Sequence, residues 1–537
     1  MNATVAAAAN PRPNLDAGLG NVGLYGFLAV LLAGLGFVAY SIYADATAAG
    51  VHSIAILAFV LLFVALLIAL GFEFVNGFHD TANAVATVIY THSLPAHVAV
   101  VWSGFFNFLG VMTSAGAVAF GIVSLLPVEL ILQVSGQAGF AMVFALLIAA
   151  IIWNLGTWYF GLPSSSSHTL IGSIIGVGVA NAMLHGRSGT AGVDWGKATE
   201  IGQALLLSPL VGFFAALLLF LAVKAVVRIP ALYKEPVGNT PPPFFIRLLL
   251  ILTCTGVSFF HGSNDGQKGM GLIMLILIGI VPTAYALNRA VPASYEAQFH
   301  ASSVAANAVF TAHAAPNTGA PLAIDAARAE VTTYIAEHKF TPATLGALSV
   351  LSSDIDHQVA SYGSLAKVPA EVTGNIRNEM YLTSSAMKRL AKEKSVKLAP
   401  AETKALDAYK KNLDKATQFI PTWVKVAVAI ALGLGTMIGW KRIVVTVGEK
   451  IGKSHLTYAQ GAVAEIVTMA TIGAADNFGL PVSTTHVLSS GVAGAMAGNG
   501  SGLQWSTLRN MAVAWVLTLP VSIMLAGTLY VALSQVI

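Results

Sequence analysis

Two short polar stretches, NGFHDTAN at residues 76–83 and HGSNDGQK at residues 261–268, stand between long apolar segments. Each contains one aspartate, Asp80 in the first stretch and Asp265 in the second. A carboxylate within an apolar region is costly unless it binds a cation, carries a proton or caps a helix. The two aspartates are therefore the first candidates for a functional site.

Each stretch is followed by a second block that is rich in hydroxyl groups. GLPSSSSHTL at 161–170 and GLPVSTTHVL at 479–488 align without a gap, with His168 matching His486. Because both kinds of block occur twice in the same order, we interpret the chain as a duplication. The interval between the two copies is much longer for the hydroxyl-rich block than for the polar stretch. The second half therefore contains an insertion, which lies between positions 268 and 479.

The composition determines the class of protein. Of the 537 residues, 56% are hydrophobic and 10% are charged, against roughly 25% charged residues in soluble proteins. These values predict a polytopic membrane protein in a lipid bilayer. With the duplicated blocks and the apolar segments, we expect an all-α fold of two inverted-topology repeats with broken helices and about 11–12 transmembrane segments. The net charge of +4 is spread over many loops and does not indicate a nucleic-acid surface. A single cysteine, Cys254, excludes an internal disulfide.

The chain divides into six parts by hydropathy and charge. We expect a lead-in and an extra transmembrane helix at 1–50, the first repeat at 51–228, a linker at 229–243, the start of the second repeat at 244–287, a soluble insertion at 288–420 and the remainder of the second repeat at 421–537. For the apolar residues 24–43, a cleaved signal peptide is the alternative. For the insertion we favour a spacer over a regulatory role.

Basic residues predict the membrane topology. They cluster in two loops, with Lys224, Arg228, Lys234 and Arg247 in one and Lys441, Arg442, Lys450 and Lys453 in the other. The positive-inside rule places both loops in the cytoplasm, so an even number of crossings separates them. If 244–287 crosses once, the insertion lies outside and each repeat has five crossings. The halves are then inverted repeats, as in secondary transporters.

The four blocks together point to an anion. We expect Asp80 and Asp265 to cap helices that restart at Thr81 and Gly266, and the Ser/Thr blocks to lie where two more helices restart. Four positive helix N-termini and their hydroxyls would form a cage for a tetrahedral oxyanion. The aspartates would repel a bare anion, so we interpret them as ligands of a hard cation or as proton carriers.

Seven strings over most of the chain carry a family resemblance: NGFHDTANAVATVIYT at 76–91, AAIIWNLGTWYFGLP at 149–163, SSSHTLIG at 165–172, HGSNDGQKGMGL at 261–272, GTMIGWKRI at 435–443, GEKIGK at 448–453 and PVSTTHVLSS at 481–490. On these strings the chain resembles the inorganic phosphate transporter (PiT) family, in particular its bacterial low-affinity, proton-coupled branch. The resemblance implies uptake of phosphate through the bacterial inner membrane as a neutral divalent metal-phosphate complex, moved with a proton.

The family's duplicated G-x-N-D-x-x-N signature has two departures here. His79 replaces its first Asn in one copy, and Lys268 replaces its second Asn in the other. In sodium-coupled relatives these blocks are expected to help hold sodium, and a fixed ammonium at Lys268 could take that charge's place. Glu73 precedes Asp80 by seven residues and shares its helical face, which adds a candidate proton carrier.

These arguments give one set of candidate residues. The candidate substrate-binding residues are Asp80, Thr81, Asn83, Ser165, Ser166, Ser167, Asn264, Asp265, Lys268, Ser483, Thr484 and Thr485. The candidate proton-coupling residues are Glu73, Asp80 and Asp265. We expect phosphate, protons, a divalent metal such as magnesium, and arsenate as partners, with a homodimer as an assembly to test, no nucleic acid and no resident cofactor. Glu465 and Asp476 lack repeat partners and receive no role.

Three other functions compete with this interpretation. A sodium-coupled phosphate symporter would use the same blocks. An intramembrane serine hydrolase could use Ser165 with His168 or His486, but an enzyme needs one nucleophile and the Ser/His block occurs twice. A passive anion channel would not accumulate its substrate against a gradient. We therefore expect a transporter and not an enzyme.

Overall fold

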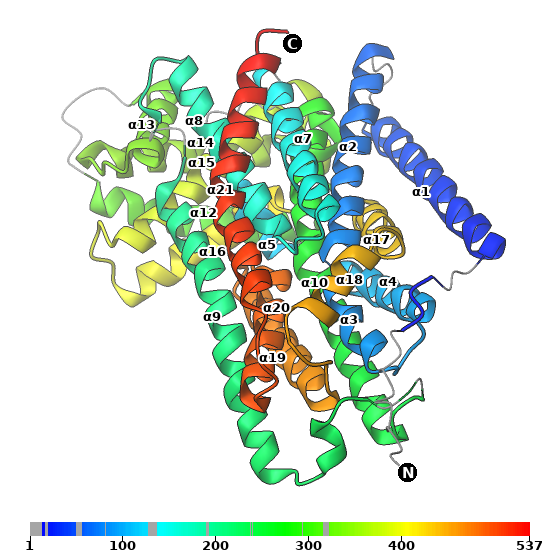
Figure 1. The fold of residues 1–537 in the computed structure, drawn as a ribbon. Coiled ribbons are helices and arrows are strands. Elements are labelled where there is room, and N and C mark those ends of the chain that lie inside the picture. Colours follow the sequence, from blue (N-terminus) through cyan, green and yellow to red (C-terminus); the bar gives the residue numbers. More distant parts are fainter. Residues whose placement is uncertain are drawn as a thin grey trace, which may run out of the picture.

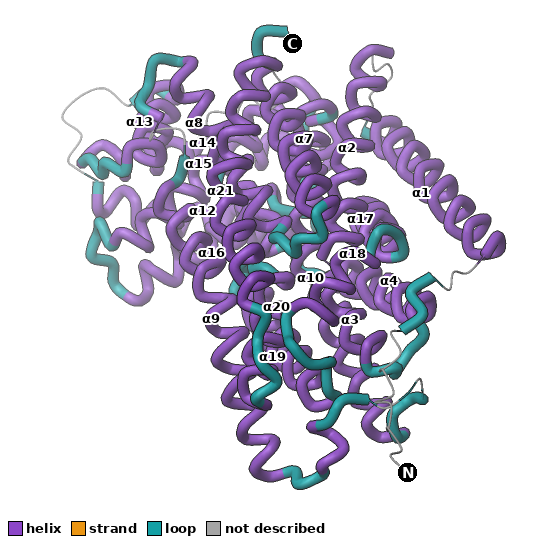
Figure 2. Tube along the Cα trace, viewed as in Figure 1, coloured by secondary structure: helices purple, strands orange, loops and turns teal. Residues whose placement is uncertain are grey.

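The computed structural model describes residues 13–16, 20–49, 56–80, 82–126, 131, 137–189, 193–236, 238, 240–292, 294–314 and 322–536. In these ranges the fold is a bundle of helices (Figures 1 and 2). The helices before the insertion are α1 (Gly20–Ala48), α2 (Ile56–Asp80), α3 (Ala82–Tyr90), α4 (Ala96–Thr113), α5 (Ala117–Val123), α7 (Gln137–Tyr159), α8 (Ser166–Leu184), α9 (Trp195–Val226), η2 (Pro230–Tyr233), α10 (Phe244–Ile280) and α11 (Pro282–Tyr285). The helices after it are α17 (Thr422–Thr436), α18 (Lys441–Val445), η4 (Thr446–Lys450), α19 (Tyr458–Asn477), α20 (Thr484–Asn499) and α21 (Trp505–Leu533).

The chain is a multi-pass membrane protein. Eight spans in the described residues are long and apolar enough to cross a bilayer, or nine if the bent pair Pro400–Thr417 and Thr422–Thr436 is counted as one span. The eight are Gly20–Ala48, Phe59–Tyr90, Ala96–Thr113, Gly139–Tyr159, Ser166–Leu184, Trp195–Val226, Phe244–Ile280 and Trp505–Leu533. The other predicted crossings of the second half fall on α17, α19 and α20, which are not among the eight.

The second polar stretch does not break its helix. We expected a helix to restart at Gly266 with Asp265 as its cap, but α10 runs without interruption through 37 residues, Phe244–Ile280. Once a helix has started, each further residue adds a hydrogen bond, so one glycine in a well-packed helix is tolerated. The segment 244–280 therefore crosses once, as the parity argument required. The prediction that four helix N-termini meet was wrong, because α10 supplies none there.

Helices of the two halves are paired crosswise. α2 packs on α17 and α4 packs on α10, while α8 packs on α21 and α9 packs on α20. The duplicated blocks make α2 equivalent to α10 and α8 equivalent to α20. Thus α2 packs on α17, which follows α10, the equivalent of α2, in the second half. In the same way α8 packs on α21, which follows α20, the equivalent of α8. A duplication related by a twofold axis would produce this exchange.

Two equivalent glycines permit close approach at two of these crossings. Gly77 of α2 and Gly262 of α10 each occupy the second position of their polar stretch, so they correspond in the duplication. A Cβ atom at Gly77 would overlap the backbone of Leu432 in α17, and one at Gly262 would overlap the backbone of Asn107 in α4. Small residues of this kind let transmembrane helices approach backbone to backbone.

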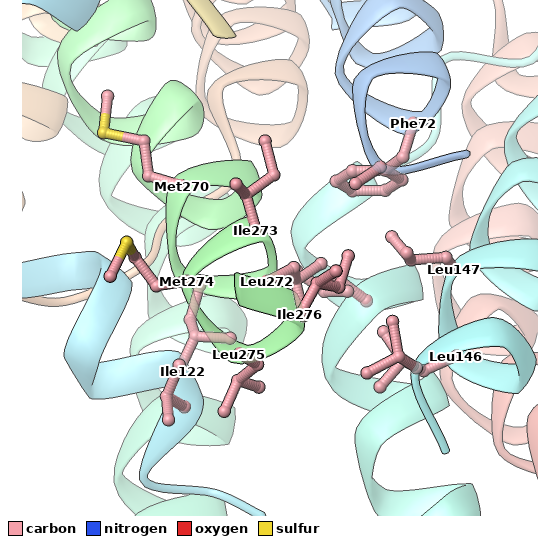
Figure 3. Close-up of a cluster of buried hydrophobic side chains, with 14 of the residues drawn as sticks. Phe72, Ile122, Leu146, Leu147, Met270, Leu272, Ile273, Met274, Leu275 and Ile276 are labelled. Carbon is pink, nitrogen blue, oxygen red and sulfur yellow. The ribbon is translucent and has the colours of Figure 1, made fainter. Parts of the chain in front are cut away.

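The half of α10 that follows the polar stretch is buried in the core. Figure 3 shows its residues Met270, Leu272, Ile273, Met274, Leu275 and Ile276 facing Phe72 of α2, Ile122 of α5, and Leu146 and Leu147 of α7. This apolar packing holds the end of α2 and the middle of α10 together. The two polar stretches are thereby brought to the same depth of the bundle.

The insertion forms a helical bundle with a hydrophobic core of its own. It consists of α12 (Tyr295–His313), α13 (Ile324–Glu337), α14 (Pro342–Tyr362), the short η3 (Leu365–Lys367), α15 (Ala370–Glu393) and α16 (Pro400–Thr417). Its core includes the rings of Tyr295, Phe299 and Tyr409. In Figure 1 these yellow-green helices lie beside the membrane bundle.

The insertion and the basic loops lie at opposite ends of α9. Arg389 of the insertion pairs with Asp194, which caps the start of α9, at 3.4 Å. After the end of α9, the linker residue Glu235 accepts a hydrogen bond from the backbone of His455 at 3.0 Å. The two loops that we assigned to the cytoplasm therefore meet at one end of the bundle.

We predict that Gly262→Ala destabilises the protein by about 1–3 kcal/mol, because the added methyl group would push α10 away from α4. Thermal unfolding of the purified protein in detergent measures the loss. Gly71→Ala on α2 is the matched control, since nothing lies within 4 Å of its Cβ position. An unchanged melting temperature for Gly262→Ala would contradict this account of the crossing.

Candidate functional site

The two hydroxyl-rich blocks begin helices, as the sequence predicted. Ser165 is the N-cap of α8 and accepts a hydrogen bond from the amide of His168 at 3.2 Å. Ser483 is the N-cap of α20 and accepts one from the amide of His486 at 3.1 Å. The two helix starts lie side by side, because the Ser167 hydroxyl donates to the carbonyl of Val482 at 2.9 Å. Two positive helix ends therefore face one region.

Asp80 at the end of α2 is the centre of this region. Its carboxylate accepts a hydrogen bond from Ser166 of α8 at 2.5 Å and another from Thr485 of α20 at 2.7 Å. The ring of His79 lies 3.0 Å from the same carboxylate through its Nδ1 atom. Asp80 thus joins the hydroxyl-rich blocks of both halves at one buried group.

His79 is fixed by contacts that sequence reasoning did not foresee. Its Nε2 atom lies 3.1 Å from the hydroxyl of Thr157 and 3.5 Å from that of Ser164. The ring therefore bridges α7, the loop before α8 and Asp80. We noted His79 only as a departure from a signature, and its position next to Asp80 in the sequence was the available signal.

Asp265 forms the second charged group of the site. The ammonium of Lys268, one turn further along α10, lies 2.6 Å from Asp265 Oδ2 and donates to the Ser167 hydroxyl at 2.5 Å. Lys268 is completely buried. It is therefore an ion-pair partner of Asp265 as well as a cation beside the hydroxyl-rich block. Ser166 lies 3.4 Å from the same Asp265 oxygen and so links the two aspartates.

Several buried polar atoms around the aspartates have no hydrogen-bond partner in the described part of the chain. Among the predicted residues they are Oδ1 of Asp265, Oδ1 of Asn264, Oγ1 of Thr484 and Oε1 of Glu73. An unpaired buried polar atom costs about 1–3 kcal/mol. These atoms are available to hydrogen-bond a polar ligand.

Of the other predicted residues, Asn264 and Glu73 lie in described positions, whereas Thr81 and the side chain of Asn83 do not. The Asn264 amide donates to the carbonyl of Leu480 just before the second hydroxyl-rich block, at 3.1 Å. Glu73 lies on α2 against Gly269 of α10. Its Oε2 atom accepts a hydrogen bond from the side-chain amide of Asn76 at 3.4 Å. Thr81 lies outside the described residues. The prediction that Asp80 caps a helix starting at Thr81 therefore also lies outside them. The side chain of Asn83 is also outside the described set.

A cation site can be formed from three buried groups. Asp80, His261 and Asp265 each offer one ligand atom, and these atoms lie within 4.8 Å of one another. His261 is oriented by Asn107 of α4, whose Oδ1 lies 2.6 Å from the ring Nδ1. Two carboxylates with one imidazole suit a divalent cation with a preference for oxygen. His261 was not among our predicted ligands, although it opens the second polar stretch.

Glu465 is a further buried acid to which the sequence assigned no role. It lies on α19, and its two carboxylate oxygens accept hydrogen bonds from Thr87 of α3 and Thr253 of α10. Asp476 on the same helix accepts from Ser263 at 2.7 Å and Gln267 at 2.8 Å. Neither residue has a counterpart in the first repeat, so repeat symmetry could not identify them.

Taken together, the site can hold a cation and an oxyanion at once. Two carboxylates attract the cation, while two helix ends, the ammonium of Lys268 and the hydroxyls attract the anion. Asp80, Asp265 and Lys268 carry a formal charge of one negative unit together.

Comparisons with known proteins agree with the sequence resemblance. The sequence profile described as "Phosphate transporter family" matches residues 76–526. The low-affinity inorganic phosphate transporter PitA of Escherichia coli (strain K12) is 43% identical over 483 residues, which cover 88% of this chain and 96% of that protein. PitB of the same strain is 41% identical over 506 residues, with the same coverage of both chains. A solved structure titled "The sodium-dependent phosphate transporter" is 20% identical, covers 89% of this chain and 100% of its own, and has a TM-score of 0.49.

We predict that Asp265→Asn destabilises the protein by about 3–5 kcal/mol, because Lys268 would remain buried and charged without its partner. The double variant Asp265→Asn with Lys268→Met should recover most of this loss. Chemical unfolding in detergent measures both.

Lys410→Met is the matched control for this cycle. Lys410 pairs with Asp414 one turn away on α16, and both side chains are partly exposed; a pair at the surface contributes about 0–1 kcal/mol. If Asp265→Asn unfolded no more readily than Lys410→Met, the buried ion pair would not stabilise the site.

Proposed function

Because the chain belongs to the phosphate transporter family, we propose that it carries inorganic phosphate across the membrane by alternating access and symport with protons. It is not an enzyme. The observation that carries the proposal is the single carboxylate of Asp80, which receives hydroxyl groups from the equivalent blocks of both halves, Ser166 and Thr485. A site shared between two repeats is the arrangement from which alternating access follows.

Phosphate is recognised by donors on the two helix starts. The Thr484 hydroxyl has no partner in the described residues and lies at the first position of α20. Ser166 and Ser167 lie at the start of α8 beside it, and each would turn its hydroxyl from Asp80 or from the Val482 carbonyl to the phosphate. Backbone amides at helix starts and hydroxyl groups bind tetrahedral oxyanions without regard to the central atom. Arsenate is therefore a second substrate.

The phosphate travels with a divalent metal such as magnesium. Asp80, Asp265 and His261 supply the ligands for the metal, which is cargo and leaves with the phosphate. Neutralising phosphate with a metal lowers the cost of bringing it beside two carboxylates. This proposal accounts for acids and anion-binding helix ends in one buried site.

Protons, and not sodium ions, are the coupling ions in this proposal. The fixed ammonium of Lys268 already lies against Oδ2 of Asp265 and supplies the single positive charge that a sodium ion would bring there, whereas Oδ1 of Asp265 has no partner in the described residues. Glu73, Asp80 and Asp265 are the acidic side chains near the site through which a proton could pass. A sodium-coupled symporter is the alternative, and its test is the ion dependence described below.

Alternating access follows if the halves are inverted repeats in a bacterial inner membrane. The crosswise helix pairs described above would then move as units about the shared site. The insertion would lie outside, because it packs at the end of α9 opposite the basic loops. A serine hydrolase has no support in the site, since the Ser165 hydroxyl accepts from an amide and bonds no histidine ring in the described residues.

Uptake of radiolabelled phosphate into proteoliposomes tests this function. We predict that an inward proton gradient with magnesium drives accumulation, whereas sodium alone does not. The three ions are varied one at a time, with protein-free liposomes as the control. Accumulation that needs sodium and ignores the proton gradient would contradict proton coupling, and no accumulation under any condition would contradict phosphate transport.

We predict that Thr484→Val raises the KM for phosphate by about tenfold, roughly the effect of losing 1.4 kcal/mol of binding. Its folding should not change, because the lost hydroxyl has no partner in the described residues. Thr471→Val on α19, whose hydroxyl donates to Val467 within its own helix, is the matched control. An unchanged KM in Thr484→Val would remove Thr484 from the phosphate site.

We predict that a deletion of residues 290–415, closed with a short Gly/Ser linker, keeps measurable uptake. The two ends of the insertion already meet, since the amide of Asn288 donates to the carbonyl of Ala416 at 2.8 Å. All the site residues lie outside the deleted segment. Complete loss of uptake in a correctly inserted protein would show that the insertion completes or gates the pathway.

A further inference from the structure

The rings of His168 and His486 pack against each other in the first turns of α8 and α20. Their ring centroids lie 4.6 Å apart at an interplanar angle of 38°. The His486 ring also stacks on Trp515 of α21, with centroids 4.1 Å apart. The two histidines occupy matching positions in the duplicated blocks, and both are more than nine-tenths buried. The pair therefore lies where the two halves meet.

Among the described residues, neither ring forms a hydrogen bond. Nδ1 of His168 and Nε2 of His486 are buried without a partner in the part of the chain that is described. The caps of α8 and α20 use the backbone amides of these residues and not their rings. An apolar ring would fill the same space without the cost of an unpaired buried nitrogen. The unpaired nitrogens therefore indicate a ligand.

The candidate ligand is a proton, which is the smallest ligand that an imidazole nitrogen binds. Imidazole is the side chain whose charge ordinarily changes between pH 5 and 8. The aspartates are less available, because Asp80 already has three partners and Asp265 is paired with an ammonium. Hydrogen bonds and opposite charges favour the ionised form of a carboxylate.

We propose that the His168–His486 pair is the binding site of the transported proton. The proton binds to Nδ1 of His168 or Nε2 of His486 and leaves from the same pair on the other side of the membrane. This inference rests on the proposed proton symport and names the atoms that carry the proton. It places the proton next to the phosphate site and not on the aspartates.

The charges around the pair limit it to one proton. The titratable groups that face it are Asp80 from the end of α2, which attracts a proton, and Lys268 from α10, which repels one; α21 contributes the uncharged Trp515. Two protonated rings this close would repel each other strongly in a buried site. One proton would cancel the single negative charge that Asp80, Asp265 and Lys268 share.

The test separates net transport from exchange. In proteoliposomes, His168→Asn and His486→Asn should each reduce phosphate accumulation driven by a proton gradient by at least about tenfold, a usual size for a lost coupling. Exchange of internal for external phosphate at equal pH moves no net proton and should continue. His300→Asn in α12, which pairs with Asp356 on the insertion, is the control and should retain accumulation.

Three other results would overturn the inference, each for a different reason. If both variants accumulate phosphate like the wild type, the pair does not carry the proton. If His168→Gln and His486→Gln, as well as the Asn variants, lose exchange together with accumulation, the rings serve folding or phosphate binding instead. If the wild type itself ignores the proton gradient, the proposed symport fails before the histidines are considered.

Discussion

A carboxylate in the interior of a membrane protein needs donors or a cation around it, and Asp80 obtains its donors from two helices that are distant in the sequence. Ser166 comes from α8 in the first half of the chain and Thr485 from α20 in the second, and both bond the same group. This requirement holds the starts of the two helices together. The positions of the packed rings of His168 and His486 and of the Thr484 hydroxyl follow from it, because they share the same first turns.

The rest of the bundle serves to bring α2 and α10 to that point. Gly77 and Gly262 let these helices cross their neighbours at backbone contact, and the apolar half of α10 packs against α2 and α7 (Figure 3). Lys268 then neutralises Asp265 within one helical turn. The site therefore keeps one uncompensated carboxylate, that of Asp80, beside the two helix starts.

The sequence predicted the local parts of this site and missed the long-range ones. The two Ser/Thr blocks were identified as helix starts, because capping depends on residues within one turn. The break at Asp265 was wrongly predicted, since tertiary packing carries α10 through a glycine that local propensity disfavours. The hydrogen bonds of Glu465 to Thr87 and Thr253 could not be foreseen, because they join helices with no shared pattern in the sequence.

The central claim is that one site between the repeats holds a metal ion and a phosphate together. A cryo-electron microscopy structure of the protein in lipid nanodiscs with manganese and phosphate tests it directly, since manganese replaces magnesium at oxygen-rich sites. We predict density for the metal among Asp80, His261 and Asp265 and for phosphate against Ser166 and Thr484. Phosphate bound elsewhere, such as in the cavity of about 450 Å³ that Lys197 of α9 lines together with Arg389 and Lys392 of the insertion, with no density between the aspartates, would contradict the account.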